Sequence, residues 1–532
     1  MEDLNERRLS KDFILLSRIF EKSPRLFEKF RKCLQPLPAS KRLIRHMLKK
    51  LAAIQWNPQS AAHLLNRAGF GGTPREIQFL ANLGLEGAVS YLVDYERIPE
   101  DLQNPPWAKP DPTRFERFQK LKTASEEERR AFRQEEQRTQ RQQIIELRQW
   151  WLQRMVATPR PLEEKLTLFW HGHFATSVRK VKDAYLMWRQ NDVFRRGASG
   201  NWLTLLAEVS KDPAMLIWLD QAQSRKEHPN ENFAREVMEL FTLGEGHYTE
   251  RDVTESARAL TGWSYDRVAQ EFRNRPGMHD PGAKTVLGRA GSFDGDEILR
   301  IIVAQPQASR FIAAKLWTFF AAENPPGELV NMLAADFRAQ DYNFKPLLRT
   351  IFTSELFYSD SVVRRQIKSP VQWLVSSVKL LERELPPPMV SATALRLLGQ
   401  ELFAPPNVKG WDGGLSWITT NSLLNRDNFA AYLVLGESPL GDLAPKNGKG
   451  QGRRRAIPEG HPIDPVKIVP LVERRDTATV VLALEKRFLQ TALRGKQSRT
   501  LIEYIESQAP LDDLDILHAT RLLMSTPEFQ LT

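Results

Sequence analysis

The sequence predicts a mainly α protein: a large multi-helix domain with long loops and at most short β-hairpins. Three observations lead to this prediction. Residues that start and stop helices recur along the chain. Strand signals, by contrast, are sparse. The length of 532 residues, with 41% hydrophobic residues and 13 Trp, is sufficient for a substantial helical core.

The first helices are marked by their ends. Residues 57–69 open with Asn-Pro and stop at a glycine, and residues 73–84 open with a capping box that has proline at the first helical position. Ser125 to Glu128 starts a long, heavily charged helix that runs toward the Trp150–Trp151 pair. This helix is either a solvated arm of a helical hairpin or a surface for a partner.

Later elements follow the same rules. A capping box at Thr249 to Asp252 starts a helix that runs through Leu260. Further helices are expected to start at Asp294, Asp341 and Ser369, and to occupy Thr477–Ser507 and Leu511–Met524. Short strands are expected only within Thr285–Leu287 and Ile457–Ile468.

Composition divides the chain into four parts. Residues 1–56 are predicted to be a basic N-terminal extension and residues 57–438 the main helical domain. Residues 439–466 are rich in Gly, Pro and basic residues, which is typical of a loop or linker. Residues 467–532 are expected to form C-terminal helices that pack back on the main domain.

The net charge of +11 is concentrated in few places. Residues 1–50 hold 14 Lys/Arg and 6 Asp/Glu, a net of 14 − 6 = +8, which leaves 11 − 8 = +3 for the rest. A nucleic-acid groove would instead spread basic and aromatic residues along one surface. We therefore expect no specific nucleic-acid binding.

Other features of the sequence indicate where in the cell the protein is located. No run of about 18 apolar residues is present, so no transmembrane segment is predicted. The single Cys33 excludes an intrachain disulfide and a cysteine-based metal framework. Because no export signal is visible, a cytoplasmic location is the default expectation, with association with the cell envelope as the alternative.

The stretch from Asn230 to Trp263 contains the most unusual carboxylate. It predicts two amphipathic helices around a Gly-rich turn, with Glu236 at the margin of the apolar stripe, about 60° from Phe233. The stripe consists of Phe233, Val237, Leu240 and Phe241. A carboxylate in that position needs a cation, hydrogen-bond donors or a metal.

Two hypotheses satisfy this carboxylate, and a third treats Glu236 or Glu239 as a general acid/base with His171 or His173 as its counterpart. In the first, Arg258 and Lys284 pair with Glu236 and hold two helices in register. In the second, His171 and His173 lie in an extended segment, where both rings share a face and suit a divalent metal. The predicted metal ligands are His171, His173, Glu236, Glu239, His279 and Asp280, and the candidate catalytic residues are Glu236 and His171.

Asn407 to Gly414, followed by Trp417, is a glycine-rich aromatic loop. Its tryptophans offer flat surfaces for a sugar or a peptide, but a packed loop between helices is the favoured interpretation because burial is the commoner use of aromatic side chains. The candidate binding residues here are Trp411, Trp417, Lys409 and Asp412.

Elsewhere we find no GxxxxGK[ST] phosphate loop, no GxGxxG motif after a strand and no GxSxG elbow, which disfavours ATPases, dinucleotide enzymes and ordinary serine hydrolases.

Several motifs, all in one order, resemble a single family. They are LLNRAGFGGTPREI (64–77), NENFARE (230–236), MELFTLG (238–244), ARALTGW (257–263), HDPGAK (279–284), NVKGWDGG (407–414) and STPEFQ (525–530). The chain resembles, over about residues 57–532, the bacterial family known as domain of unknown function 1800. The resemblance implies no catalytic residue. It does imply a protein partner or an envelope role, because members of that family are often encoded beside another uncharacterised, secreted-type family.

Two functional classes follow. The first is a binding or assembly protein with a buried polar centre around residues 230–263, in which the long charged helix and the Trp-rich loops contact a protein partner or a polymer. The alternative is a metal-dependent, hydrolase-like enzyme that uses the His/carboxylate cluster. No cofactor is certain, and a divalent metal is the cofactor that the second class requires.

Overall fold

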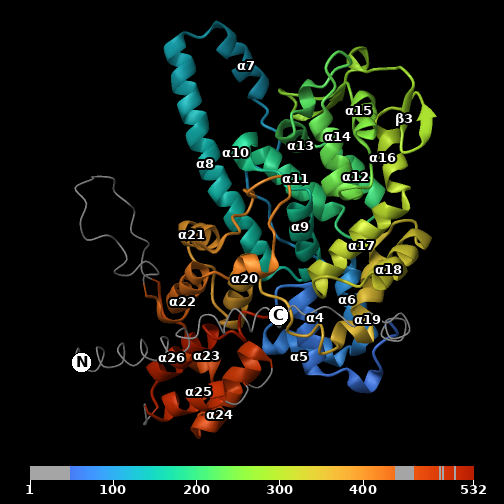
Figure 1. Ribbon diagram of the computed structural model, residues 1–532. Helices are drawn as coiled ribbons and strands as arrows, with labels where there is room; N and C mark the ends of the chain where they lie inside the picture. The colour runs from blue at the N-terminus through green and yellow to red at the C-terminus, as the bar shows by residue number, and fades with distance from the viewer. Residues whose placement is uncertain (1–47, 438–459, 491–492, 494–495, 508–510) are drawn as a thin grey trace.

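Helices form almost all of the regular structure in the computed structural model, which describes residues 48–437, 460–490, 493, 496–507 and 511–532 (Figure 1). The sheets of this described part are two small antiparallel hairpins. The prediction of a mainly α fold is therefore confirmed. Most of the predicted N-terminal extension, and the segment 439–459 of the predicted loop, lie outside the described residues.

The first helices begin and end close to the predicted residues. Asn57 caps α4 by accepting a hydrogen bond from the backbone N–H of Ser60, and Thr73 and Glu76 form the predicted capping box of α5. Residues 49–51 contact the end of α19 through backbone hydrogen bonds. The elements of this part are α4 (Pro58–Ala68), α5 (Pro74–Asn82) and α6 (Gly84–Val93), with α19 (Phe344–Thr353) beside them.

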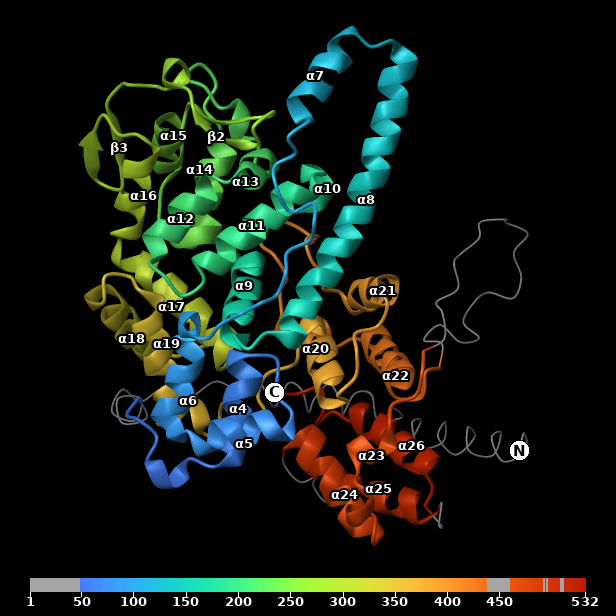
Figure 2. The same cartoon turned by 180° about the vertical axis from the view of Figure 1, so that it is seen from behind.

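A helical hairpin rises from the body of the molecule in both ribbon views (Figures 1 and 2). It consists of α7 (Arg114–Thr123) and α8 (Glu126–Ala157), and Ser125 and Glu128 make the predicted capping box at the start of α8. The buried residues of α8 begin only at Ile144. The first half of this helix therefore extends beyond the core.

The central helices surround α9 (Pro161–His173), a helix that is buried on all faces. The predicted capping box at Thr249 and the predicted start at Asp294 are both present, whereas the helix expected at Asp341 begins three residues later, at Phe344. These elements are α10 (Val178–Val181), α11 (Ala184–Arg196), α12 (Trp202–Ser210), α13 (Pro213–Trp218), α14 (Glu231–Glu236), α15 (Glu250–Ala259), α16 (Gly295–Val303), α17 (Pro306–Phe320) and α18 (Gly327–Ala339).

Two β-hairpins follow α15. Strands β1 (Trp263–Asp266) and β2 (Glu271–Asn274) pair with each other, as do β3 (Lys284–Val286) and β4 (Arg289–Gly291). The strand expected at Thr285–Leu287 thus exists, but the hairpin of β1 and β2 was missed. The expectation of a strand within Ile457–Ile468 is wrong where it is described, because Pro465–Ile468 forms a helical turn capped by Asp464.

The C-terminal helices pack on α20 to α22, at the opposite end of the molecule from the hairpin (Figure 1). The C-terminal helices are α23 (Pro465–Ile468), α24 (Thr477–Leu484), α25 (Lys496–Glu506) and α26 (Asp513–Met524). The helices on which they pack are α20 (Pro370–Leu380), α21 (Pro388–Leu398) and α22 (Thr420–Leu435). Among the described helices, none is both long enough and apolar enough to span a membrane.

The interior contains two large hydrophobic clusters. The first is formed mainly by α4 to α6 and α12 to α19, and the second mainly by α8 and α20 to α26. Helix α9 contributes to both, with Phe169 in the first cluster and Leu168 in the second, and so does α11, with Phe194 in the first and Leu186 in the second. These shared helices connect the two halves of the core.

Candidate functional site

The helix that carries Glu236 changes type directly after that residue. α14 ends at Glu236 and continues as a π-helix over Val237–Thr242, in which the N–H of Leu243 donates to the carbonyl of Met238 at 2.7 Å. The predicted single α-helix through Leu243 is therefore wrong in its second half. Such wider turns occur frequently at functional sites.

The side chain of Glu236 is half-buried, as the amphipathic pattern predicted, but it lacks the predicted partners. Burial raises its pKa, and the neighbouring Glu239 raises it further, whereas Lys409 and Arg235 oppose this shift. Within the described part of the chain, Glu236 makes no hydrogen bond or ion pair. It is a carboxylate that lies close to the surface, with cations nearby but not in contact.

The predicted pairing of Glu236 with Arg258 and Lys284 is wrong. Arg258 instead pairs with Asp280 (2.7 Å) and with Glu255 (2.9 Å), one turn away on its own helix. The Nζ of Lys284 donates to two backbone carbonyls, those of Asp280 (2.6 Å) and Gly282 (2.9 Å). These groups stabilise the turn before β3 and leave Glu236 outside their network.

His171 and His173 do not lie in an extended segment, because they form the last turn of α9. Two residues apart on a helix, their side chains point about 200° apart. The Nε2 of His171 accepts the backbone N–H of Phe403 at 3.0 Å. The Nε2 of His173 donates to the carbonyl of Phe241 at 3.0 Å, and Lys315 donates to Nδ1 at 3.3 Å. The imidazole of His173 thus binds a backbone carbonyl near the end of the π-helix, that of Phe241.

The predicted metal ligands are not brought together. In the described residues, no group of three or more His, Cys, Asp or Glu side chains is placed to hold a metal ion. Glu239 accepts a hydrogen bond from the hydroxyl of Tyr248, and Nδ1 of His279 lies 3.1 Å from the carbonyl of Thr261. Burial lowers the pKa of His171 to about 3, so its imidazole is neutral and serves as an acceptor.

The loop from Asn407 to Gly414 packs on the end of α9. Its Gly410 has a φ of 84°, and a Cβ atom there would lie 2.2 Å from the carbonyl oxygen of Gly172. Trp411 is half-buried, with its ring 5.6 Å from that of His171, and Trp417 is buried. Lys409 and Asp412 are exposed. This arrangement matches the packed interhelix loop among the two alternatives, while ligand binding by its polar side chains stays a prediction.

The carboxylate that is fully withdrawn from water is Glu164 on α9, a residue that the sequence reasoning missed. Its oxygens accept hydrogen bonds from the indole N–H of Trp151 (2.7 Å), from Arg154 (2.8 Å) and from Arg195 (2.7 and 3.1 Å). Burial alone would raise its pKa, but Arg195 and Arg154 lower the pKa to about 2. The sequence held one indication: two adjacent carboxylates in PLEEKLTLFW, a stretch in which six of the ten residues are apolar.

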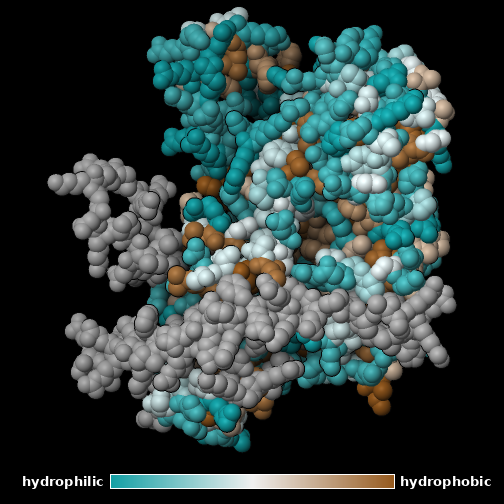
Figure 3. Space-filling view, in the orientation of Figure 1, coloured by the Kyte–Doolittle hydropathy of each residue, from teal (hydrophilic) through white to brown (hydrophobic). Residues whose placement is uncertain are grey.

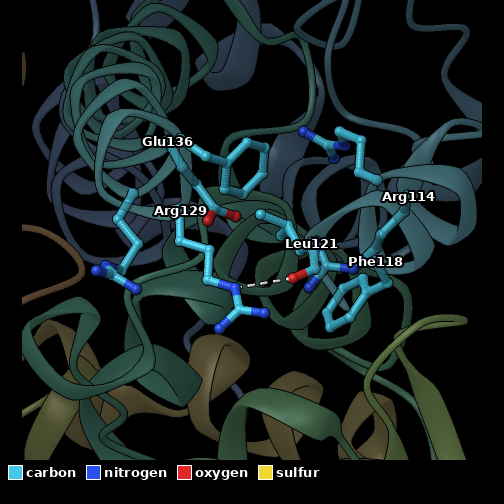
Figure 4. Close-up of a pocket in the computed structure, with 8 residues that line it drawn as sticks. Arg114, Phe118, Leu121, Arg129 and Glu136 are labelled. Atoms are coloured by element: carbon cyan, nitrogen blue, oxygen red, sulfur yellow. Dashed lines mark hydrogen bonds between the residues drawn. The ribbon is translucent and has the colours of Figure 1, made fainter. Parts of the chain in front are cut away.

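An accessible concave site lies between α7 and α8. A pocket of about 260 Å³ opens between the two helices, and arginines, apolar side chains and one glutamate line it (Figure 4). Its lining consists of Arg114, Arg117, Phe118, Leu121, Arg129, Phe132, Arg133 and Glu136. We call this the hairpin pocket.

A second pocket of about 340 Å³ extends the first toward the base of the hairpin. Both pockets share Arg114, Arg117, Phe132 and Glu136, so they form one continuous groove along the inner side of the hairpin. At the base the groove reaches Tyr185 of α11. The surface of the hairpin is mostly hydrophilic, with apolar side chains visible between its two helices (Figure 3).

The arginines of the hairpin pocket differ in their contacts. Arg129 donates from Nε and Nη2 to the carbonyls of Leu121 and Lys122, both at 3.0 Å, and so caps the C-terminal end of α7 (Figure 4). Arg117 pairs with Asp111. Arg133 is exposed and makes no hydrogen bond or ion pair within the residues that the structure describes. Free guanidinium donors therefore remain at the rim.

Comparison with known proteins gives one match. A family model described as protein of unknown function (DUF1800) matches residues 63–531. No curated protein matches the chain. No solved structure matches it either. Because the family match spans nearly the whole chain, this protein belongs to the DUF1800 family of proteins of unknown function.

Proposed function

We propose that this protein is a binding or assembly protein, and that the α7–α8 hairpin is the element that contacts its partner. The observation that carries this proposal is the length of helix exposed outside the core. Residues 126–143 precede the first buried residue of α8, and at 1.5 Å per residue they extend about 27 Å. Apart from contacts such as those of Arg129 with the end of α7 and of Gln140 with Ala184, a helical arm of this length presents surface that the fold does not use.

The weak packing of the hairpin supports the proposal. α7 is ten residues long and has no buried residue, and helices shorter than about 12–15 residues are marginal without tertiary contacts. Two of its phenylalanines are exposed, Phe115 at 58% and Phe118 at 37%. A partner that covers these rings would add the apolar burial that the hairpin lacks.

The polar side chains near Glu236 favour a binding or assembly protein over a metal-dependent hydrolase. Both imidazoles of α9 already have hydrogen-bond partners in the backbone. The described residues around Glu236 form no group of ligands for a metal ion, and the hydrogen-bonded pair of Tyr248 and Glu239 does not include Glu236. We therefore assign the polar residues there to holding the α9 end, the π-helix and the loop at 407–414 together.

Site-specific photocrosslinking in cells that produce the full chain tests the proposal. A photoreactive phenylalanine analogue at Phe115, and separately at Gln137 on the exposed part of α8, should give an adduct with the same protein. The matched control is the analogue at Leu471, which is 68% exposed but distant from the hairpin. Reciprocal binding of the two purified proteins should then follow. Absence of a common adduct, or the same adduct from Leu471, would contradict the proposal.

A further inference from the structure

The lining of the hairpin pocket combines two kinds of group. Four arginines surround three apolar side chains, with the single carboxylate of Glu136 beside them. The guanidinium of Arg114 lies 5.6 Å from the ring of Phe118, and that of Arg117 lies 6.0 Å from the ring of Phe132. Guanidinium groups stack on aromatic rings and bind carboxylates through paired hydrogen bonds. The pocket therefore favours a ligand that is both anionic and apolar.

Free donors face this ligand at the rim. Arg133 has no partner in the described part, and Arg129 uses two nitrogens for backbone carbonyls and keeps Nη1 available. Arg117, in contrast, is paired with Asp111, and its Nε is buried without a hydrogen bond. Arg114 is likewise held at the base of the hairpin by the carbonyl of Arg267 (3.0 Å) and by Asp183 (3.7 Å). The charges of Arg114 and Arg117 are therefore paired with carboxylates, whereas Arg129 and Arg133 have no carboxylate partner in the described part of the chain.

We propose that the hairpin pocket binds an acidic segment of a partner protein that carries one bulky apolar side chain. This inference rests on the proposed function and names the chemistry of the partner. The apolar side chain enters between Phe118, Leu121 and Phe132, and flanking carboxylates pair with the guanidiniums of Arg133 and Arg129. A volume of about 260 Å³ lies just below the usual range for drug-sized ligands, as expected for a pocket that accepts one side chain.

The charge pattern favours an acidic protein segment over a nucleic acid. Glu126, Glu127 and Glu128 begin α8, and Glu135 and Glu136 line the groove. A long chain of phosphates would lie against these carboxylates as well as the arginines, and phosphate contacts dominate nucleic-acid affinity. A short acidic segment at the pocket itself meets four arginines and one carboxylate, that of Glu136.

An array of twelve-residue peptides tests the inference, with binding of the purified full chain measured by fluorescence anisotropy. One class combines several Asp/Glu with a central Trp, Phe or Leu. The others replace the central residue by Ser, replace the acids by Lys, or consist of single-stranded DNA. Members of the first class should bind, with an affinity that falls as salt is raised. Stronger binding by the basic peptides or the DNA, or no binding by the first class, would overturn the proposal.

Variants locate the site. Arg133→Glu and Phe118→Ala should each lower the affinity of the best acidic peptide by about tenfold or more. The matched control is Arg138→Glu, an exposed arginine on α8 outside the pocket lining, which should change the affinity less than about threefold. Equal losses in Arg133→Glu and Arg138→Glu would reject the pocket as the site.

The outcomes of the two experiments can be separated. If hairpin crosslinking identifies a partner but no acidic peptide binds, the partner-binding function stands and the acidic-segment inference fails. If peptides bind at the hairpin pocket but crosslinking gives no adduct, the chemistry of the pocket is supported and the cellular role fails. Melting temperatures equal to that of the unmodified protein exclude loss of fold as the cause.

Discussion

At the scale of single residues, the neighbours Glu163 and Glu164 are affected by burial in opposite ways. Arginines on two other helices contact Glu164 and keep it ionised. Glu163 has one oxygen without a hydrogen bond, and its nearest cation, Arg160, is 3.8 Å away. Burial, together with Glu164 and Glu100 nearby, raises the pKa of Glu163 to about 7. One carboxylate thus stabilises the fold at neutral pH and the other opposes it.

Replacement of Glu164 should be strongly destabilising. Glu164→Gln leaves the buried guanidinium of Arg195 without its carboxylate and leaves Arg154 with Glu100 alone, which costs roughly 3–5 kcal/mol of unfolding free energy. The folded-state pKa of about 2 lies below the ordinary 4.5, so this stabilisation is present above pH 4.5 and is lost as pH falls toward 2. Urea unfolding at pH 7 and pH 3 measures it. The exposed Glu227→Gln is the control, and equal effects of the two variants would disprove the assignment.

Glu163→Gln should have the opposite pH dependence. Because the folded-state pKa of Glu163 is raised from 4.5 to about 7, the unmodified protein loses stability as pH rises through this interval. The glutamine variant has no proton to lose. It should therefore gain in unfolding free energy, relative to the unmodified protein, between pH 5 and pH 8. A difference between the two proteins that does not change with pH would contradict this account.

Two glycines that touch each other should differ in their tolerance of a methyl group. Gly410→Ala places a Cβ against the carbonyl of Gly172 and retains a positive φ, so we expect a loss of about 2 kcal/mol or more. At Gly172 the nearest atom to a new Cβ is 4.0 Å away, in Trp411. Gly172→Ala, within a helix, should be neutral or stabilising by about 0.5–1 kcal/mol. Thermal unfolding of both variants measures this, and similar losses would contradict the packed-loop description.

At the scale of elements, the sequence predicted helix starts better than helix interiors. A capping box such as Thr73 to Glu76 is a local interaction, so its residues are visible in the sequence. The π-helix at Val237–Thr242 has no local sequence cause that we can identify. Its Phe241 carbonyl accepts a hydrogen bond from His173, which is 68 residues away. The prediction of an extended His171–His173 segment rested on the His-x-His spacing alone, whereas the segment continues α9.

The candidate site was predicted only in part. The charged helix at Ser125 was recognised as a partner surface or a solvated arm, but its pocket depends on the return of α7, whose pattern is weak. The partners of Glu164 come from α8 and α11 and cannot be read from α9 alone. Trp417 was identified as a residue that suits burial because an indole is mostly apolar surface.

The hairpin should depend locally on Arg129. Its guanidinium is bonded to the last carbonyls of α7, which otherwise have no partner within the helix. Arg129→Ala should therefore increase amide hydrogen exchange in residues 114–125 severalfold, with little change in the global melting temperature, because opening is local. Arg130→Ala, an exposed neighbour, is the control. A global loss of stability, or equal exchange in both variants, would count against this capping role.

At the scale of the whole molecule, the two hydrophobic clusters are connected by buried polar contacts as well as by α9. Lys165 of α9 donates a hydrogen bond to Gln372 of α20, and Lys379 of α20 pairs with Glu76 of α5 at 2.9 Å. Burial lowers the pKa of Lys165 to about 7. The desolvation free energy of burying its amine is therefore smaller than that of burying a permanently charged group. The two halves of the core therefore share side chains at their boundary.

This connection predicts cooperative unfolding of both clusters. Leu347→Ala, in α19, removes a fully buried side chain from the first cluster and should cost about 2–5 kcal/mol. If α9 couples the clusters, amide protection in α26, which belongs to the second cluster, should be lost at the same reduced urea concentration as protection in α19. Hydrogen exchange measured across a urea series compares these two helices. Retention of protection in α26 after α19 has opened would show that the clusters unfold separately.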